Sequence, residues 1–469
     1  MRSLEKKQVS LDDKEQIRKD DLNHYFHSYT NFQHKSLEPS VYCQAKDHFI
    51  FDDNGKEYID GIAGLWCVNI GHGNEEMAYR LSEQAKKLAY YNTFGRASSP
   101  PSAKLAAKLA EISPGNLNHV FFGTGGSMAN DTAIKIVHYY NNILGRPKKK
   151  KIISRDLGYH GSTYMAHALT GIKSTHIGFD LPIEGLIHHV SAPYDYRRPK
   201  EISSEDFCDY LVNELEEKIL ELGPENVACF IAEPIMGAGG VVVPPEGYNF
   251  RTWELCKKYD ILYIADEVVT AFGRLGHMVA SKDKFNVQPD ILIMAKGISS
   301  GYVPLGATMI SDKIYEVVSK PKKDNPYFSH GFTYSGHALA CASGLINIEI
   351  MEKMNLCDHV KEWGPYFESE LKKLLQYSIV GDVRGSHFML GIEFVKDKMS
   401  KEFFDPNSYD VTAKIFASCK KLGLIVRPVG PMVILSPPLT FDKEAIDNTV
   451  LILSRSIEEA VSELKLTSI

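Results

Sequence analysis

The chain has 469 residues, of which 44% are hydrophobic and 24% are charged, a composition typical of a soluble globular protein with one large and one smaller domain. A formal net charge of -6 and the lack of a basic run beyond 148–151 argue against nucleic acid or an anionic membrane as a partner. The amino-terminal stretch MRSLEKKQVSLDDKEQIRKDD contains no apolar segment. We therefore expect neither a signal peptide nor a membrane anchor, and we predict a cytoplasmic location.

The cysteines are scattered along the chain and include no C-x-x-C pair. Most of the eight lie in apolar or helical surroundings, where a free thiol behaves as a small hydrophobe. This pattern predicts reduced thiols in a reducing compartment. No H-E-x-x-H or other zinc spacing occurs, so no metal site is expected.

Much of the chain alternates between predicted strands and helices. A charged, helical lead-in precedes a hairpin over 48–60, whose turn at Asn54 and Gly55 is a strong hairpin signal. Apolar runs bounded by polar turns then predict buried strands of an α/β sheet, and apolar residues at helical spacing predict helices between them. The strands are expected at 119–123, 151–154, 227–232, 261–265, 291–295 and 305–310, and two of the helices at 102–112 and 205–222.

The pattern changes after a long helix that follows the stretch SHGFTYSGHALACASG at 329–344. Two strand-like runs, SIVGDVRG and FMLGIEFV, come next, and the chain closes with a helix that carries apolar residues on one face. This part of the sequence predicts a smaller α+β domain.

Two charged residues stand directly after predicted strands, Asp266 after 261–265 and Lys296 after 291–295. Ligands bind at the carboxyl ends of strands in open α/β sheets, so these residues are predicted to bring a carboxylate and an amine to one site. The alternative is a buried salt bridge, or two strand-end charges that point at water.

A glycine-rich turn, GTGGSMAN at 123–130, leads into a predicted helix. Backbone amides at a helix amino terminus bind anions, and glycines allow a phosphate to approach closely. A dinucleotide fingerprint would require glycine where Met128 stands. The remaining alternative is a turn that serves helix packing only.

Five further residues are candidates, and each has a plainer explanation. Tyr159 and His160 precede a helix; an aromatic residue there is often core, but a flat cofactor needs a flat stacking partner. Glu233 follows a strand and could be an exposed charge, and Trp66 lies in a glycine-rich loop where it could pack or line a site. Arg427 is expected at the end of a short strand, where it could be a surface residue or could bind a carboxylate through two parallel hydrogen bonds.

The stretch ADEVVTAFGRLG, with Asp266 as its second residue, and the stretch AKGISSGYVPLGA, with Lys296 as its second, together resemble the cofactor-binding signature of class III pyridoxal-phosphate aminotransferases. The resemblance covers nearly all of the chain after about residue 40. It implies fold type I, with a large domain built on a mostly parallel sheet flanked by helices and a smaller α+β domain. The implied division is an amino-terminal segment at 1–60 that contributes to the small domain, a large cofactor-binding domain at 61–340 and a carboxy-terminal small domain at 341–469.

The resemblance also implies roles for individual residues. Asp266 would pair with the pyridine nitrogen of pyridoxal 5'-phosphate, and Lys296 would bind the cofactor covalently and act as the general base. Tyr159, with His160 beside it, would stack on the pyridine ring, and Val268 would press on the opposite face. Glu233 would orient Asp266 through hydrogen bonds.

Two segments are implied to hold the phosphate. Gly126 and Ser127 fall where the family has its phosphate-binding loop, although Thr124, Gly125 and Met128 replace its usual asparagine, serine and glutamate. Thr333, in HGFTYSGH, would reach the phosphate of the neighbouring subunit's cofactor. The resemblance therefore implies a homodimer with its active site at the subunit interface.

The segments around Trp66, Tyr159 and Arg427 look closest to the ω-amine:pyruvate group, which implies substrate-binding roles for Trp66 and Arg427. We therefore predict transfer of an amino group from an ω-amine or ω-amino acid to a 2-oxo acid such as pyruvate, by a ping-pong mechanism. Three alternatives remain open: a diaminopelargonic-acid or ornithine-type aminotransferase, a decarboxylase or mutase on the same fold, and a protein that binds the cofactor for regulation only.

Overall fold

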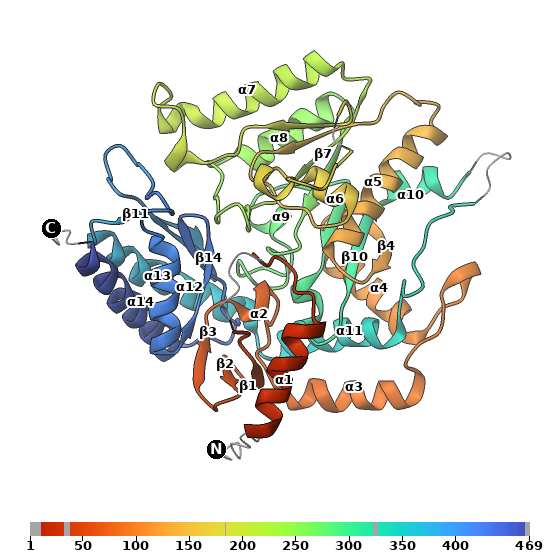
Figure 1. Cartoon of the computed structure of the whole chain (residues 1–469). Coiled ribbons are helices and arrows are strands. Elements are labelled where there is room, and N and C mark those ends of the chain that lie inside the picture. The colour runs from red at the N-terminus through yellow and green to blue at the C-terminus, as the bar shows by residue number, and fades with distance from the viewer. Residues whose placement is uncertain (1–10, 32–37, 183, 322–326, 465–469) are drawn as a thin grey trace.

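The computed structural model describes residues 11–31, 38–182, 184–321 and 327–464. Its centre is a seven-stranded sheet in the order β4-β10-β9-β8-β7-β5-β6 (Figure 1). β10 is antiparallel to both of its neighbours, and the other strands run parallel to one another. The strands are β4 (Leu117–Gly123), β5 (Lys151–Arg155), β6 (Ile187–Val190), β7 (Val227–Ala232), β8 (Leu262–Asp266), β9 (Ile291–Met294) and β10 (Gly306–Ser311). The predicted mostly parallel sheet is confirmed.

Helices flank this sheet, and local sequence signals explain where several of them begin and end. α4 starts with proline after Ser99, whose side chain accepts a hydrogen bond from the backbone of Ser102, which is a favourable helix start. α7 ends at Gly223, whose φ of +77° suits glycine. The helices that precede the carboxy-terminal part are α1 (Leu11–His24), α2 (Ala63–Trp66), α3 (Glu75–Leu88), α4 (Pro100–Ile112), α5 (Gly126–Ile143), α6 (Tyr164–Leu169), α7 (Ser204–Leu222), α8 (Tyr248–Lys258), α9 (Ala280–Asp283), α10 (Asp312–Val318) and α11 (Ala338–Lys353).

Two four-stranded sheets lie beside the large sheet, in the orders β1-β2-β3-β13 and β11-β12-β15-β14. The predicted hairpin is present as the antiparallel pair β2 and β3. β3 also pairs in parallel with β13, so that Ile59 lies opposite Leu424 and the two ends of the chain share one sheet. The elements are β1 (Tyr42–Lys46), β2 (Phe49–Asp52), β3 (Glu57–Asp60), β11 (Val380–Ser386), β12 (Met389–Phe394), β13 (Leu424–Ile425), β14 (Arg427–Val429), β15 (Met432–Leu435), α12 (Leu356–Lys372), α13 (Val411–Leu422) and α14 (Lys443–Glu463).

The expected position of Arg427 needs a correction. It does not end a strand; it is the first residue of β14, after a break between β13 and β14. The break lets the chain leave β3 and pair antiparallel with β15, where Arg427 lies opposite Ile434.

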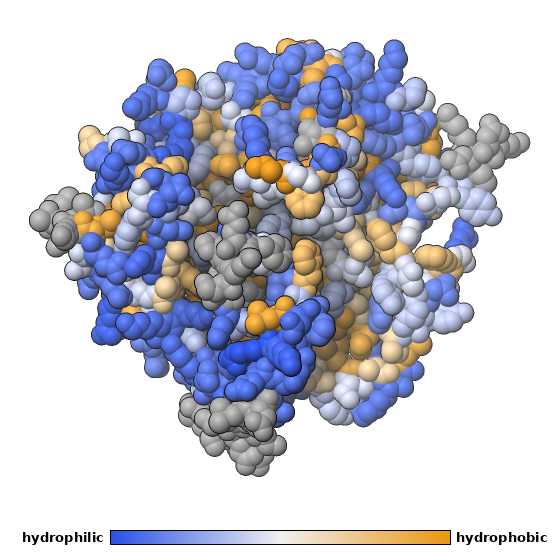
Figure 2. All heavy atoms as spheres, viewed as in Figure 1, coloured by the Kyte–Doolittle hydropathy of each residue, from blue (hydrophilic) through white to orange (hydrophobic). Residues whose placement is uncertain are grey.

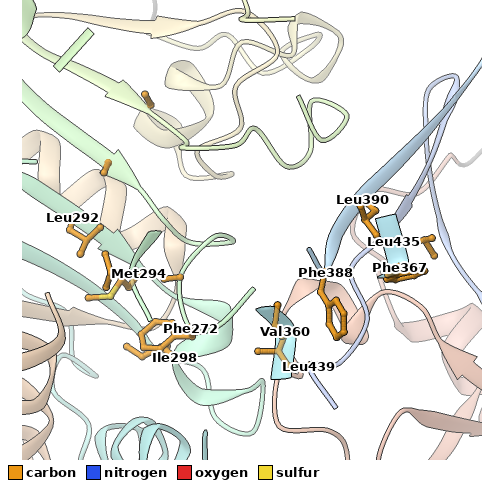
Figure 3. Packing of buried hydrophobic residues seen from close by; sticks show 14 of the residues in the cluster. Phe272, Leu292, Met294, Ile298, Val360, Phe367, Phe388, Leu390, Leu435 and Leu439 are labelled. Atoms are coloured by element: carbon orange, nitrogen blue, oxygen red, sulfur yellow. The ribbon is translucent and has the colours of Figure 1, made fainter. Parts of the chain in front are cut away.

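One continuous apolar core connects the large sheet with the carboxy-terminal part. Phe272, Met294 and Ile298 pack on the side of the large sheet, while Phe388 and Leu439 belong to the carboxy-terminal part (Figure 3). The division at 60/61 and 340/341 remains a prediction, and the second boundary falls inside α11. In the part of the chain that the structure describes, no helix has the length and apolar character needed to cross a membrane.

Candidate active site

A cavity of about 510 Å³ lies where β7 and β8 of the large sheet end. Every side chain predicted for the site lines this cavity except Thr333. These residues are Trp66, Gly126, Ser127, Tyr159, His160, Glu233, Asp266, Val268, Lys296 and Arg427.

The strand order explains why residues far apart in the sequence meet here. Asp266 is the last residue of β8, and Lys296 comes two residues after the end of β9. β8 lies between β9 and β7 and is parallel to both, and Glu233 directly follows β7. Because parallel strands end at the same edge of a sheet, the two carboxylates and the amine are delivered to one place.

The carboxylate of Asp266 is held from one side. Its Oδ2 accepts hydrogen bonds from His160 Nδ1 at 2.7 Å and from Asn130 Nδ2 at 2.9 Å. For its Oδ1, the one hydrogen bond found in the described part of the chain comes from the backbone N–H of Val268, at 3.2 Å. Oδ1 therefore keeps capacity for a further donor, as pairing with a ring nitrogen requires.

His160 and Asn130 each keep a buried polar atom without a partner in the described part of the chain. These atoms are His160 Nε2 and Asn130 Oδ1. Asn130 Nδ2 also donates to the backbone oxygen of His160 at 2.7 Å, so the two residues form one unit behind Asp266. The sequence placed His160 at the site but did not indicate that Asn130 contacts Asp266.

Glu233 does not make the hydrogen bond to Asp266 that the sequence led us to expect. Its Oε1 accepts from the backbone N–H of Tyr159 at 2.9 Å, and its Oε2 accepts from the backbone N–H of Gly237 at 2.8 Å. Burial raises the pKa of Glu233, while the nearby His160 lowers it. Glu233 thus fixes the backbone that carries Tyr159, and His160 and Asn130 hold Asp266.

Lys296 brings an amine into the cavity without a fixed partner. Its backbone has a φ of +46°, in the left-handed region that residues with a Cβ atom rarely adopt. Among the described residues, no hydrogen-bond or ion-pair partner of its Nζ is found. Burial lowers the pKa of the Lys296 ammonium, and the charges of Asp266 and Glu233 oppose this shift.

The amino terminus of α5 faces the cavity with Gly126 and Ser127. A Cβ atom on Gly126 would lie 3.0 Å from Val268 Cγ2, so glycine is needed for this close packing. The Ser127 hydroxyl accepts the backbone N–H of Ser162 at 3.0 Å. Free amides in the first turn of this long helix offer a site for an anion.

Aromatic side chains form further walls of the cavity. Trp66 is almost fully buried and packs in a cluster with Ile235 and Met389, so it serves the core as well as the cavity. Burial raises the pKa of Tyr159 to about 12. Tyr29, from the segment after α1, lies with its hydroxyl 3.3 Å from that of Tyr159.

The sequence did not indicate Tyr29 as a site residue, because the implied similarity begins only after about residue 40. Further lining residues were also missed, and their apolar or hydroxyl side chains give no local signal. They are Ser28, Leu65, Gly161, Ile172, Thr175, Ala238, Val269 and Val429.

Arg427 carries the second cationic group of the cavity. None of the ion pairs or hydrogen bonds found among the described residues involves its guanidinium. Burial lowers its pKa, and the Tyr159 and Tyr29 hydroxyls oppose this shift. A guanidinium without a protein carboxylate can bind the carboxylate of a substrate.

Thr333 lies outside the cavity of its own chain. It is exposed, and its backbone oxygen accepts a hydrogen bond from the Tyr90 hydroxyl at 2.7 Å. The predicted contact of Thr333 with the phosphate of a neighbouring subunit's cofactor stays a prediction.

These residues fit pyridoxal phosphate. The cavity offers an amine that can bind an aldehyde, a carboxylate oxygen with capacity for a ring N–H, and helix amides with a serine hydroxyl for a phosphate. The fold and the site thus define a pyridoxal-phosphate enzyme of fold type I.

The chain belongs to the family described as Aminotransferase class-III, which matches residues 31–457. It is 42% identical over 440 residues to gamma-aminobutyrate transaminase 1 of Oryza sativa subsp. indica, a match that covers 92% of this chain and 84% of the relative. Diaminobutyrate–2-oxoglutarate transaminase of Halomonas elongata is 41% identical (94% and 95% covered), and putrescine–pyruvate aminotransferase of Pseudomonas aeruginosa is 39% identical (94% and 95% covered).

Similarity to a solved structure agrees with this assignment. The omega transaminase of Pseudomonas jessenii in complex with PMP superimposes with a TM-score of 0.92 at 38% identity, and the match covers 96% of this chain and 99% of that chain. The protein is therefore a pyridoxal-phosphate-dependent transaminase. This assignment removes the support for a decarboxylase, a mutase or a regulatory cofactor-binding protein.

Proposed function

We propose that this transaminase moves the amino group of an ω-amine or ω-amino acid to pyruvate, by a ping-pong mechanism. The supporting observation is that one cavity contains the amine of Lys296 and the guanidinium of Arg427, for which no ion-pair partner is found among the described residues. The Lys296 amine can transfer a proton at the reacting carbon, and the Arg427 guanidinium can bind the carboxylate of a 2-oxo acid.

The side chains of the cavity have separate roles in the transamination reaction. When bound, pyridoxal phosphate supplies an electron sink for the charge that develops at the substrate carbon. Lys296 would take the proton from that carbon, which a lowered pKa favours because the amine is then neutral at a lower pH. Asp266 would keep a negative charge at the ring nitrogen, with His160 and Asn130 fixing its orientation.

The choice of substrates can be tested by half-reactions that follow the visible absorbance of the purified holoenzyme. Putrescine, β-alanine, γ-aminobutyrate and 2,4-diaminobutyrate would be added singly as donors, and pyruvate or 2-oxoglutarate would then be added to the aminated enzyme. We expect conversion by a donor with a terminal amine, followed by recovery with pyruvate. Recovery with 2-oxoglutarate alone would refute the acceptor and favour the diaminobutyrate or ornithine type.

Arg427 would serve only one of the two half-reactions when the donor has no carboxylate. We propose that it moves aside for the amine and returns for the 2-oxo acid. Arg427→Ala should then slow recovery with pyruvate by about 10²-fold or less, the range expected for loss of a charge-assisted contact, and should leave conversion by putrescine nearly unchanged. An equal loss in both half-reactions would contradict this proposal.

We also propose a cytoplasmic homodimer in which Thr333 serves the neighbouring site. Exposed aromatic residues near Thr333 support an interface there, namely Tyr91, Phe94, Tyr327 and Tyr334. The segments before α4 and α11 lie at the right-hand side of Figure 1, and Figure 2 shows pale and orange side chains mixed with blue ones on that side.

Mixing of an inactive variant with one that binds the cofactor weakly tests this arrangement. Lys296→Ala lacks the amine, and Thr333→Ala is expected to bind pyridoxal phosphate more weakly. A mixed dimer would contain one site with an intact Lys296 and an intact Thr333 from opposite subunits. Activity at limiting cofactor should therefore rise above the sum of the two variants after subunit exchange; no rise would place Thr333 outside the neighbouring site.

A further inference from the structure

The turn that carries Lys296 is held in an unfavourable backbone conformation. Lys296 and Ser300 both have positive φ angles, +46° and +47°, although neither is glycine. Left-handed backbone costs free energy for such residues and persists only when surrounding contacts fix it. Within the turn itself, the Ile298 N–H donates to the Ala295 oxygen at 3.0 Å, and the Ser300 N–H donates to the Gly297 oxygen at a longer 3.3 Å. The carbonyl groups of Gly297 and Ile298 can both accept further hydrogen bonds from outside the turn.

Asn347 of α11 supplies those outside contacts. Its Nδ2 donates to the backbone oxygens of Gly297 at 2.8 Å and Ile298 at 3.0 Å, the two carbonyls that follow Lys296. Its Oδ1 accepts from the Ser300 hydroxyl at 2.5 Å. Asn347, Ser300 and Ile298 are all buried, so water cannot replace these bonds without opening the core.

The opposite side of the turn leaves it little room to shift. A Cβ atom on Gly297 would lie 2.4 Å from Asn69 Nδ2, and Asn69 is itself fixed by a hydrogen bond to the Phe272 oxygen at 2.6 Å. The Ser300 hydroxyl also accepts the backbone N–H of Ile70, at 3.2 Å. The turn is thus clamped between the loop around Asn69 and Asn347 of α11.

We propose that Asn347 is a positioning residue for the reaction. It holds the carbonyls of Gly297 and Ile298 so that Lys296 keeps its left-handed backbone and directs its amine into the cavity. The inference rests on the proposed role of Lys296 and adds to it a residue outside the cavity that controls where the amine lies.

The test compares Asn347→Asp with Ser300→Ala and with a control, Ser343→Ala. Asparagine and aspartate have the same shape, but aspartate lacks both N–H donors. Ser300→Ala removes the bond that orients the Asn347 amide and avoids a buried charge. Ser343 lies one turn before Asn347 in α11 and is fully buried. Its hydroxyl donates to the Ala340 oxygen at 2.7 Å and has no other partner among the described residues, so its loss perturbs the helix but not the turn.

Two readouts distinguish positioning from general damage. The first is the rate at which the apoprotein captures pyridoxal phosphate covalently, trapped by borohydride and located by peptide mass spectrometry. The second is the deuterium isotope effect in the donor half-reaction, with the donor labelled at the carbon that loses its proton. Asn347→Asp should slow covalent capture and the donor half-reaction by about 10²-fold each, as a misplacement near 1 Å can do. The isotope effect should become larger, and the donor KM should change little.

Ser300→Ala should slow covalent capture and enlarge the isotope effect, as Asn347→Asp does. Ser343→Ala should leave the capture rate and the isotope effect as in the wild type. Wild-type capture and isotope effect in Ser300→Ala would overturn the proposal, and so would an equal loss in Ser343→Ala. If Asn347→Asp fails to fold, Ser300→Ala decides alone. Covalent capture that persists in Lys296→Ala would instead refute the proposed role of Lys296 and not the clamp.

Discussion

Lys296 and Arg427 are two basic side chains that the fold places in one cavity, and neither has an ion-pair partner within 11–31, 38–182, 184–321 and 327–464. A buried charge without a partner is costly, and the protein reduces this cost by favouring the neutral amine at Lys296. The same shift serves proton transfer, because only the neutral amine can accept a proton. The lowered pKa of Lys296 therefore limits the cost of burying the amine and serves its reaction at the same time.

The lowered pKa of Lys296 predicts its reactivity in the apoprotein. A lower pKa means that the neutral, nucleophilic amine appears at a lower pH than for an ordinary lysine. Labelling by an amine-specific reagent should therefore reach its half-maximal rate at Lys296 below the pH needed at the lysine of a short peptide added to the same sample. Peptide mass spectrometry across a pH series measures both sites in one sample, and coinciding curves would contradict the prediction.

The same shift predicts how stability depends on pH. Because the folded pKa lies below the unfolded one, the unfolded chain binds the proton more strongly, and the penalty is fully present below the folded pKa and vanishes above the unfolded pKa. Lys296→Met should consequently stabilise the apoprotein near pH 7 and lose this advantage as the pH approaches about 10.5, the ordinary lysine value. Urea unfolding of the wild type and of Lys296→Met at both pH values measures this difference in stability. A stabilisation by Lys296→Met that grows with pH would contradict the prediction.

At the scale of single elements, the start of α5 combines a helix terminus with close packing against the turn after β8. Gly126 lies against Val268, whereas a Cβ atom on Gly125 would meet nothing within 4 Å. Packing therefore requires glycine at position 126 but not at position 125. Only Gly126 couples the helix to the wall of the cavity.

Alanine at each position tests this difference. Gly126→Ala should displace Val268 and weaken cofactor binding about tenfold or more, since overpacking costs about 1–3 kcal/mol. Gly125→Ala should bind nearly as the wild type does, because its φ of 173° is extended backbone that any residue adopts. Titration of each apoprotein with pyridoxal phosphate measures the dissociation constants, and equal losses would reject the packing argument.

At the scale of the whole molecule, a buried group of charges joins the large sheet to the carboxy-terminal part. Glu393 of β12 accepts hydrogen bonds from Arg197 at 2.8 Å and 2.5 Å, and from Arg384 of β11 at 2.8 Å. Tyr194, beside Arg197, also donates to Glu393. Arg384 in turn donates to the Gly240 oxygen at 2.9 Å, close to the cavity-lining Ala238.

Loss of the central charge should loosen this connection. Glu393→Gln removes the carboxylate charge that faces Arg197 and leaves Arg384 with Asp382 at 2.9 Å. This loss should lower the free energy of unfolding by about 3–5 kcal/mol. Glu402→Gln removes a pair with Lys396 that is more than half exposed, and should cost only about 0–1 kcal/mol. Urea unfolding of both variants gives the comparison, and similar midpoints would show that the buried group contributes little.

The sequence predicted most of the sheet because local pattern determines it. The predicted strand 227–232 matches β7, and the strands before Asp266 and Lys296 match β8 and β9 within one or two residues. Short apolar runs between polar turns leave few other structures for such segments. The positions of Asp266 and Lys296 at strand ends followed from the same pattern.

The sequence did not indicate which side chains would hold these two residues. Asn130 and Asp266 are 136 positions apart, and Asn347 lies 50 positions from the Gly297 oxygen that it contacts. An asparagine inside a helix gives no local sign of its partner. The Glu233 contact was wrong for the same reason, since its partners depend on how the loops fold back.

The sequence by itself determined the order of elements and the residue types that chemistry requires, because periodicity and short motifs act over a few residues. Only the tertiary structure decided that Tyr29 lines the cavity beside Tyr159, that Arg427 begins a strand, and that Thr333 does not line the cavity of its own chain. These outcomes depend on strand order and on packing between distant segments. Contacts of that kind are set by the free energy of the whole fold and not by neighbouring residues.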